Sequence, residues 1–281
     1  MLYIYLIISC IILFVCIIFY FLNNLINEPY VIVSMTTSPR RILLMESVIN
    51  SILNQTYPPD LIRINIPYKF KRNGEKYRIP SFLKNNPKIK IYQYEEDLGP
   101  IMKSLPTIMD HKNDDNTIII YTDDDIIMLP NIIETHIDKI NEDSSNVYCF
   151  SGIYYPNGEW LSFYHEGFIH IPEGYMSVAF KSNILKDKSC IYEYYEKLKH
   201  DKDCFQSDDF IIGNYLSMNN IKKYQIYNND INRYIWWIYH RNNVLSYGVD
   251  GDGLQDLNEG GHEGTYNRIY NKLKEINYLF L

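Results

Sequence analysis

The chain has 281 residues, with 27 lysines and arginines against 34 aspartates and glutamates, so its formal net charge is −7 at neutral pH. This length is enough for one large α/β domain, or at most two small ones, with an ample apolar core. The acidic balance and the lack of a basic patch exclude nucleic acid as the main partner.

The N-terminal stretch from Tyr3 to Leu22 is almost wholly apolar, and no charged side chain precedes Glu28. About 20 such residues match the ~30 Å hydrocarbon core of a membrane. A cleaved signal peptide would have a basic start, a shorter apolar region and small residues before the cut, and none of these is present. The sequence therefore predicts an uncleaved single-pass membrane anchor over residues 1–22 and a linker over residues 23–29. Too few positive charges flank the segment to decide its orientation.

Strand-like and helix-like segments alternate after the linker. The β-branched and apolar runs that predict strands are Tyr30–Met35, Leu61–Ile66, Ile89–Tyr94 and Ile118–Tyr121. Apolar residues at helical spacing predict helices over Ile42–Leu53 and Ile101–Met109. This alternation predicts one α/β domain over residues 30–281, with a mostly parallel sheet flanked by helices and ligands bound at the carboxyl ends of the strands.

Three consecutive carboxylates, Asp123, Asp124 and Asp125, follow directly on the last of these strands. A buried strand that delivers clustered anions to its exposed end needs a cation to offset their repulsion. Oxygen ligands favour hard ions such as Mg²⁺ or Mn²⁺, which in turn bind phosphates. The pattern predicts a metal-diphosphate site; the alternative is a solvated polar turn, in which aspartate is common.

A second acidic group, Asp208 and Asp209, follows Ser207 at the predicted start of a helix. Ser207 is a good N-cap residue, and the helix dipole favours negative charge in the first turn, so helix capping alone is one explanation. The other explanation is catalytic, because a carboxylate here could take the proton of an attacking hydroxyl.

Two motifs carry a resemblance to a known family. The segment Ser51-Ile-Leu-Asn-Gln-Thr-Tyr-Pro58 resembles the opening signature of family 2-type glycosyltransferases with the GT-A fold. The segment Asp97-Leu-Gly-Pro-Ile-Met-Lys103, followed by the aspartate triplet, resembles a related group of small glycosyltransferases of bacteria and large DNA viruses. The match covers most of Tyr30 to Leu216 and implies a GT-A fold and a nucleotide-diphosphate sugar as donor.

The resemblance also implies roles on the donor side. Asp123 and Asp125 are the expected DxD pair, with Asp125 on a Mn²⁺ or Mg²⁺ ion and Asp124 nearer the sugar or ribose. Residues expected close to the nucleotide or donor are Thr36, Thr37, Arg40 and Lys103. Lys103 could equally be a solvated helix residue.

On the acceptor side, the resemblance implies that Asp209 is the catalytic base, with Asp208 as substitute base or acceptor ligand. Glu173, Gly174 and Tyr175 would form a turn beside the cleft, because glycine allows a close approach of backbone to ligand. Trp160 could stack on a sugar ring or serve as a buried structural residue.

The C-terminal region offers one more metal ligand. His262 lies within Gly-Gly-His-Glu-Gly, on a loop that could close over bound donor and exclude water, and His240 is the alternative. Among the cysteines outside the predicted anchor, Cys190 and Cys204 could form a disulfide, and the sequence does not decide whether they do.

These inferences together predict a membrane-anchored, metal-dependent, inverting glycosyltransferase acting on a hydroxyl of a glycan or glycoconjugate. A haloacid dehalogenase-type phosphotransferase is disfavoured, because Ile126 and Ile127 follow the aspartates where that class needs a Thr or Val. A membrane-tethered carbohydrate-binding or scaffold protein with an inactive transferase fold is the rival from another class. The sequence identifies neither the sugar and its nucleotide nor the acceptor.

Overall fold

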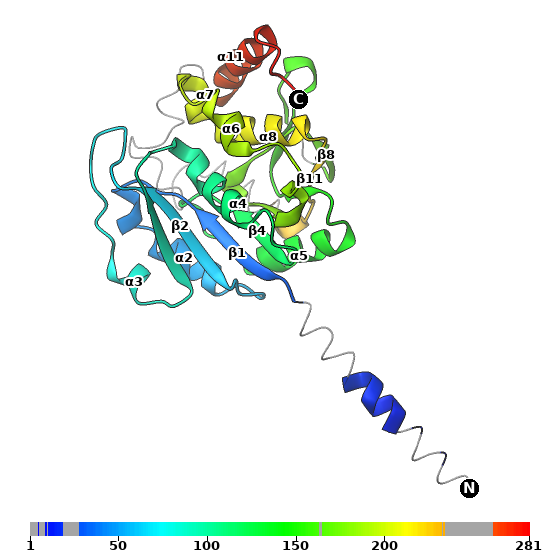
Figure 1. Cartoon of the computed structure of the whole chain (residues 1–281). Helices are drawn as coiled ribbons and strands as arrows, with labels where there is room; N and C mark the ends of the chain where they lie inside the picture. Colours follow the sequence, from blue (N-terminus) through cyan, green and yellow to red (C-terminus); the bar gives the residue numbers. More distant parts are fainter. Residues whose placement is uncertain are drawn as a thin grey trace.

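An eight-stranded mixed sheet forms the centre of the chain, with helices on both faces (Figure 1). The structure is a computed structural model that describes residues 5, 9, 11–18, 28–162, 165–231, 233 and 261–281. The strand order of the large sheet is β3-β2-β1-β4-β10-β5-β11-β8, and a small sheet has the order β7-β6-β9.

The strands of the large sheet are β1 (Tyr30–Met35), β2 (Leu61–Pro67), β3 (Ile89–Tyr94), β4 (Thr117–Tyr121), β5 (Val147–Cys149), β8 (Gly167–Ile169), β10 (Val178–Lys181) and β11 (Lys223–Gln225). The small sheet contains β6 (Gly152–Tyr154), β7 (Leu161–Ser162) and β9 (Ile171–Pro172). The α-helices are α2 (Glu46–Leu53), α3 (Ser81–Lys84), α4 (Leu105–His111), α5 (Ile132–Glu142), α6 (Ile191–Glu196), α7 (Lys202–Gln206), α8 (Asp208–Met218) and α11 (Gly261–Glu275). The 3₁₀ helices are η1 (Arg41–Leu43), η2 (Gly99–Lys103), η3 (Pro156–Gly158), η4 (Gly174–Met176) and η5 (Ser182–Leu185).

The two faces of the sheet bury separate cores, because successive side chains of a strand point to opposite faces. In β4, Ile119 and Tyr121 pack with α4, α6 and α8, and the C-terminal helix α11 joins the same core. Ile118 and Ile120 pack with α2 and α5 on the other face. All five residues of β4 are buried, so the strand delivers its carboxyl end to the site from the middle of the domain.

The expected mostly parallel sheet flanked by helices is confirmed. Strands β1 to β4 pair in parallel, and β1 and β3 have the bounds predicted from sequence. Two strands run the other way: β10 lies antiparallel between β4 and β5 and pairs Val178 with Tyr121, and β8 pairs antiparallel with β11 at the edge. The helix expected over Ile101–Met109 is divided into η2 and α4; Pro106 lacks an N–H donor and therefore fits the first turn of a new helix.

The predicted membrane anchor falls mostly outside the described residues. Residues 11–18 are helical, and their apolar side chains are exposed. Within the described part of the chain, no helix has the length and apolar character needed to cross a membrane. The anchor over residues 1–22 stays a prediction. Cys190 and Cys204, whose pairing the sequence left open, are both free.

A buried lysine lies at the start of β11. Lys223 is 1% exposed, and its Nζ donates to the carbonyl oxygen of Gly213 at 3.1 Å and to Oγ of Ser217. Both acceptors are neutral, and burial lowers the pKa of Lys223 to about 7. The unfolded chain holds this proton more tightly, since a free lysine has a pKa near 10.5. Lys223 therefore destabilises the fold at neutral pH.

We expect Lys223→Met to raise the free energy of unfolding by about 2 kcal/mol or more at pH 7. A lowered folded-state pKa gives stability that is present above the unfolded pKa and is lost as pH falls toward 7. The gain of the methionine variant should therefore shrink toward pH 10. Urea denaturation of both proteins at pH 7 and pH 10 measures it, and an equal difference at the two pH values would contradict the prediction.

Candidate active site

The two acidic groups predicted from sequence meet at one buried lysine. Asp123 follows β4, and Asp208 and Asp209 open α8. The Nζ atom of Lys103, at the end of η2, lies 2.7 Å from Asp123 Oδ1, 2.9 Å from Asp208 Oδ2 and 3.4 Å from Asp209 Oδ1. The DxD segment and the start of α8 thus form a single site around a side chain that is 3% exposed.

Lys103 is a charged member of this site and not the solvated helix residue that the sequence also allowed. Burial by itself would lower its pKa, but Asp123, Asp208 and Asp209 outweigh burial and raise the pKa well above the ordinary value. Lys103 therefore carries its positive charge at neutral pH.

The start of α8 does more than cap a helix. Ser207 precedes α8, yet its side chain makes no capping hydrogen bond. Asp208 pairs with Lys103, and Asp209 Oδ1 accepts a hydrogen bond of 3.0 Å from the backbone N–H of Gly174. Burial raises the pKa of both carboxyls, and Lys103 opposes the rise.

A second cation, Arg41, contacts the rest of the aspartate triplet. One of its terminal nitrogens lies 2.5 Å from both Asp124 Oδ1 and Asp125 Oδ2. Sequence reasoning chose the adjacent Arg40, which is exposed. The predicted place of Arg40 near the nucleotide stays a prediction, and Arg41 is the arginine that contacts the aspartates.

The predicted threonines lie at the same edge of the sheet, after β1. Thr36 Oγ1 donates to the carbonyl oxygen of Asn65 at 2.7 Å. Thr37 is buried. Burial raises the pKa of Asp124, and Arg41 and the Thr37 hydroxyl oppose this rise. The carboxyl ends of β1 and β4 therefore present hydroxyls and carboxylates side by side.

Acidic side chains are concentrated at this site. Burial raises the pKa of Asp125 to about 7, Arg41 opposes the rise, and Asp124 and Asp123 add to it. Burial also raises the pKa of Glu173. Among the described residues, six acidic side chains gather at this site, and Lys103 and Arg41 form ion pairs with five of them. Those six are Asp123, Asp124, Asp125, Glu173, Asp208 and Asp209.

This excess of carboxylate fits a hard divalent cation in charge and donor chemistry. Oδ2 of Asp124 is buried and accepts no hydrogen bond. In the part of the chain that the structure describes, no three carboxylate, imidazole or thiol side chains are grouped to hold a metal ion. His262 lies in the first turn of α11, but its side chain and all of His240 lie outside the described residues, so their predicted metal roles stay predictions.

The predicted acceptor turn lies against Asp209. Gly174 begins η4, directly after Glu173, whose Oε2 accepts a hydrogen bond of 2.6 Å from Ser151 Oγ. A Cβ on Gly174 would lie 2.6 Å from Lys103 Nζ and 3.2 Å from Asp209 Oδ1. The backbone therefore approaches the site so closely that any side chain at this position must displace a site residue.

We expect Gly174→Ala to lower any activity of this site by about tenfold or more, since displacement of site groups is costly even at distances near 1 Å. The added methyl group would push the Lys103 ammonium away from the carboxylates and would strain the contact with Asp209. Steady-state kinetics with a thermal melt as control measures the effect. Full activity in a folded Gly174→Ala protein would show that the lysine can move without consequence.

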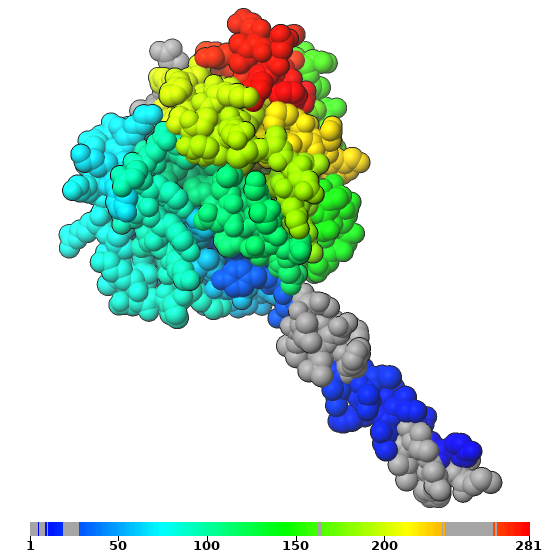
Figure 2. Space-filling view, in the orientation of Figure 1, coloured from blue at the N-terminus to red at the C-terminus, as the bar shows by residue number. Residues whose placement is uncertain are grey.

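The C-terminal helix supplies a site residue that sequence reasoning missed. Tyr266 is buried, its ring lies 5.3 Å from that of Phe210, and burial and Asp209 raise its pKa. Trp160 is half-buried and packs on Tyr266 with ring centroids 5.2 Å apart, and its predicted role toward a sugar stays a prediction. Ion pairs of Arg268 with Asp203 and of Lys272 with Asp201 join α11 to α7. Figure 2 shows α11, in red, on the yellow-green surface of that region.

No protein-family model matches the sequence, and no curated protein does. Among solved structures, the chain is similar to GalNAc-T7 with UDP, GalNAc and Mn²⁺, with a TM-score of 0.49 and 11% identity over 71% of this chain and 43% of that one. It is also similar to S. aureus TarS 1–349, with a TM-score of 0.43 and 16% identity over 70% of this chain and 57% of that one. The chain thus spans about half the length of these structures. Similarity at this level leaves the activity to be inferred from the site itself.

Proposed function

We propose that the chain is a metal-dependent, inverting glycosyltransferase of the GT-A type, which moves a sugar from a nucleotide-diphosphate sugar to a hydroxyl acceptor. One observation carries the proposal: the carboxylates after β4 and the carboxylates that open α8 converge on Lys103. A transferase needs acidic groups for two purposes, to hold a cation at the donor phosphates and to take a proton from the acceptor. This site supplies both within one buried cluster.

On the donor side, Asp123 and Asp125 would hold Mn²⁺ or Mg²⁺. The bound cation would neutralise the charge that builds on the leaving diphosphate. Lys103 and Asp124 would face the donor, and Thr36 and Thr37 would line the nucleotide side of the same strand ends. His262 would complete the metal ligands.

On the acceptor side, Asp209 would take the proton of the attacking hydroxyl. The Gly174 N–H fixes one oxygen of this carboxylate at 3.0 Å, which orients the side chain. A raised pKa makes the ionised carboxylate a stronger base than an ordinary aspartate. Asp208 would assist or bind the acceptor, together with Glu173 and Tyr175 in the neighbouring turn.

A screen of the protein against nucleotide sugars, with and without Mn²⁺, tests the proposal. A matching donor at a hundred times its Kd should stabilise the fold by about 2.7 kcal/mol. The same donor should then be hydrolysed slowly in the presence of Mn²⁺ and transferred to an added acceptor. Donor binding with neither hydrolysis nor transfer would instead support the inactive carbohydrate-binding or scaffold protein.

We further propose that residues 3–22 attach the protein to a membrane. The full-length chain should stay with membranes through an alkaline carbonate wash, because an apolar stretch of about 20 residues is held by the hydrocarbon core. A chain beginning near Asn24 should be recovered in the supernatant. Release of the full-length chain by the wash would contradict the anchor.

A further inference from the structure

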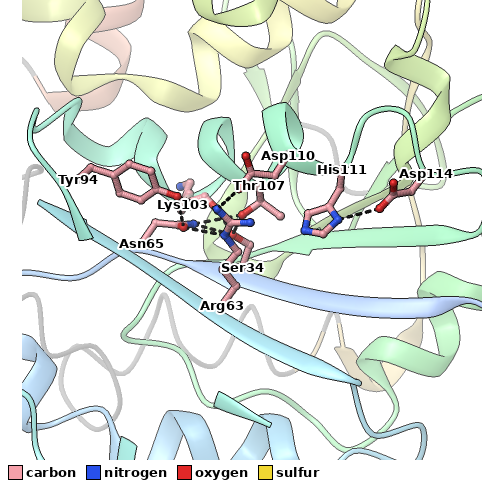
Figure 3. A network of polar contacts seen from close by, with 9 residues as sticks. All are labelled: Ser34, Arg63, Asn65, Tyr94, Lys103, Thr107, Asp110, His111 and Asp114. Atoms are coloured by element: carbon pink, nitrogen blue, oxygen red, sulfur yellow. Dashed lines mark hydrogen bonds and ion pairs between the residues drawn. The ribbon is translucent and has the colours of Figure 1, made fainter. Parts of the chain in front are cut away.

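A chain of buried polar side chains runs across the sheet to Lys103 (Figure 3). Arg63 and Asn65 lie in β2, Ser34 in β1 and Thr107 in α4; Arg63 is 1% exposed and the other three are fully buried. Polar groups at such positions cost free energy unless their hydrogen bonds are satisfied. None of these four side chains has a buried nitrogen or oxygen without a partner. The opposite face of β2 carries Ile62, Ile64 and Ile66 in an ordinary apolar core.

The donor and the acceptor can be assigned for each hydrogen bond of this network of polar side chains. Arg63 donates to Asp110 at 2.5 Å and to Asn65 Oδ1 at 2.8 Å. Asn65 Nδ2 donates to Ser34 Oγ at 3.1 Å and to Thr107 Oγ1 at 3.2 Å. Ser34 has one hydroxyl hydrogen, and it donates this hydrogen to the carbonyl oxygen of Lys103 at 2.6 Å. The hydroxyl of Thr107, 2.6 Å from Ser34 Oγ, must therefore donate to Ser34.

This network of polar side chains ends at Lys103, the residue that contacts both acidic groups of the site. The carbonyl of Lys103 is held by Ser34, while its ammonium lies among Asp123, Asp208 and Asp209. Lys103 also ends η2, and only Ser104 separates it from the start of α4, so its backbone lies at the junction of the two helical segments. Loss of the Ser34 bond would release the backbone at this junction and move the ammonium.

We propose that Ser34, fixed by Thr107, Asn65 and Arg63, is a positioning residue for Lys103, and that this buried chain sets where the Lys103 ammonium stands between the donor-side and acceptor-side carboxylates. Its catalytic consequence rests on the proposed transfer reaction. Its effect on the ion pairs of Lys103 does not, because those ion pairs are present without donor or acceptor.

A double-mutant cycle on stability tests the inference without any substrate. Ser34→Ala and Asp208→Asn are made singly and together in the full chain, and unfolding by urea is measured at pH 7. If Ser34 positions Lys103, the cost of Ser34→Ala includes a weakened ion pair, so the unfolding constants should deviate from multiplicativity by about fivefold. Ser34→Ala with Asp123→Asn gives a second cycle that should deviate in the same direction.

Ser182→Ala is the matched control. Ser182 is fully buried and donates its hydroxyl to the carbonyl oxygen of Asp114 at 2.8 Å, a bond of the same kind. It follows β10 at the opposite end of β4 from the aspartates. Its cycle with Asp208→Asn should be multiplicative. Multiplicative behaviour in both Ser34 cycles would overturn the inference.

The catalytic readout uses two variants of Thr107. Thr107→Val keeps the volume and removes the hydroxyl that fixes Ser34, so kcat should fall by about tenfold, as expected for a small displacement of a catalytic group. Thr107→Ser keeps the hydroxyl and should retain most of kcat. Equal kcat values in the two variants would contradict the inference. If the wild-type protein transfers no sugar, the proposed function fails, and the stability cycles alone decide the role of Ser34.

Discussion

Replacing Asp209 by asparagine is expected to lower kcat for sugar transfer by about 10²- to 10⁴-fold, the usual contribution of a general base. The amide keeps the size of the side chain and an oxygen that can still accept from the Gly174 N–H. It lacks a lone pair basic enough to take the acceptor proton. Donor Kd should therefore stay nearly constant, since only transition-state stabilisation is lost. Donor binding by calorimetry and single-turnover transfer separate the two quantities.

The pH profile gives an independent check on the same residue. A general base acts when it is ionised, and burial raises the pKa of Asp209 well above that of a free aspartate. In a plot of kcat against pH, the rise of kcat should therefore occur at a higher pH than an exposed aspartate base would give. Asp208→Asn is the close comparison and should chiefly weaken acceptor binding. Full turnover by Asp209→Asn with collapse in Asp208→Asn would exchange the roles, and no loss in either would refute the base.

Asp125→Ala is expected to abolish Mn²⁺-dependent donor binding while leaving the fold intact. The substitution removes a carboxylate that would bind the metal, and Asp125 belongs to neither apolar core. Donor affinity measured with Mn²⁺ should fall by about a hundredfold, the upper range for loss of a metal-site group. Asp115→Ala, which removes an exposed aspartate before β4, is the control and should bind donor normally. Normal Mn²⁺-dependent affinity in Asp125→Ala would end the metal assignment.

The same variant should change the pH dependence of stability. Burial raises the folded-state pKa of Asp125 to about 7, so this group contributes stability that is present below its unfolded pKa and is lost as pH rises through about 7. At pH 8 without metal, Asp125→Ala should accordingly raise the free energy of unfolding by about 1 to 3 kcal/mol relative to the wild type. That gain should disappear near pH 4. Urea denaturation at the two pH values measures the difference.

Local patterns in the sequence were enough to predict strands β1 to β4 and the carboxylates that follow β4. The bounds of β1 and β3 follow from short β-branched runs closed by turns, and the carboxylates after β4 follow from an apolar run that ends in three charges. Both signals depend on neighbours in sequence. The two acidic groups could be proposed as parts of one site because each lies at the start or end of an element.

What the sequence could not give is the set of contacts that join distant segments. Lys103 touches residues 20 and more than 100 positions away, and no local pattern reveals this. Tyr266 enters the site from the C-terminal helix for the same reason. Strands of three or four residues, such as β5 and β10, are too short for periodicity to identify. The contact of Arg41 with Asp124 and Asp125 likewise joins residues more than 80 positions apart.

The reversed direction of β10 brings a segment that enters a strand to the edge of the sheet where β1 to β4 end. Because β10 begins beside the end of β4, the segment that enters β10, from Glu173 to Ser177, lies at the same edge as the DxD carboxylates. In the proposed transferase, the nucleotide side is built from segments that leave strands, and the acceptor side from the segment that enters β10 together with the start of α8. Insertions between β6 and β10 could therefore alter which acceptor is recognised while β1 to β4 keep the donor machinery unchanged.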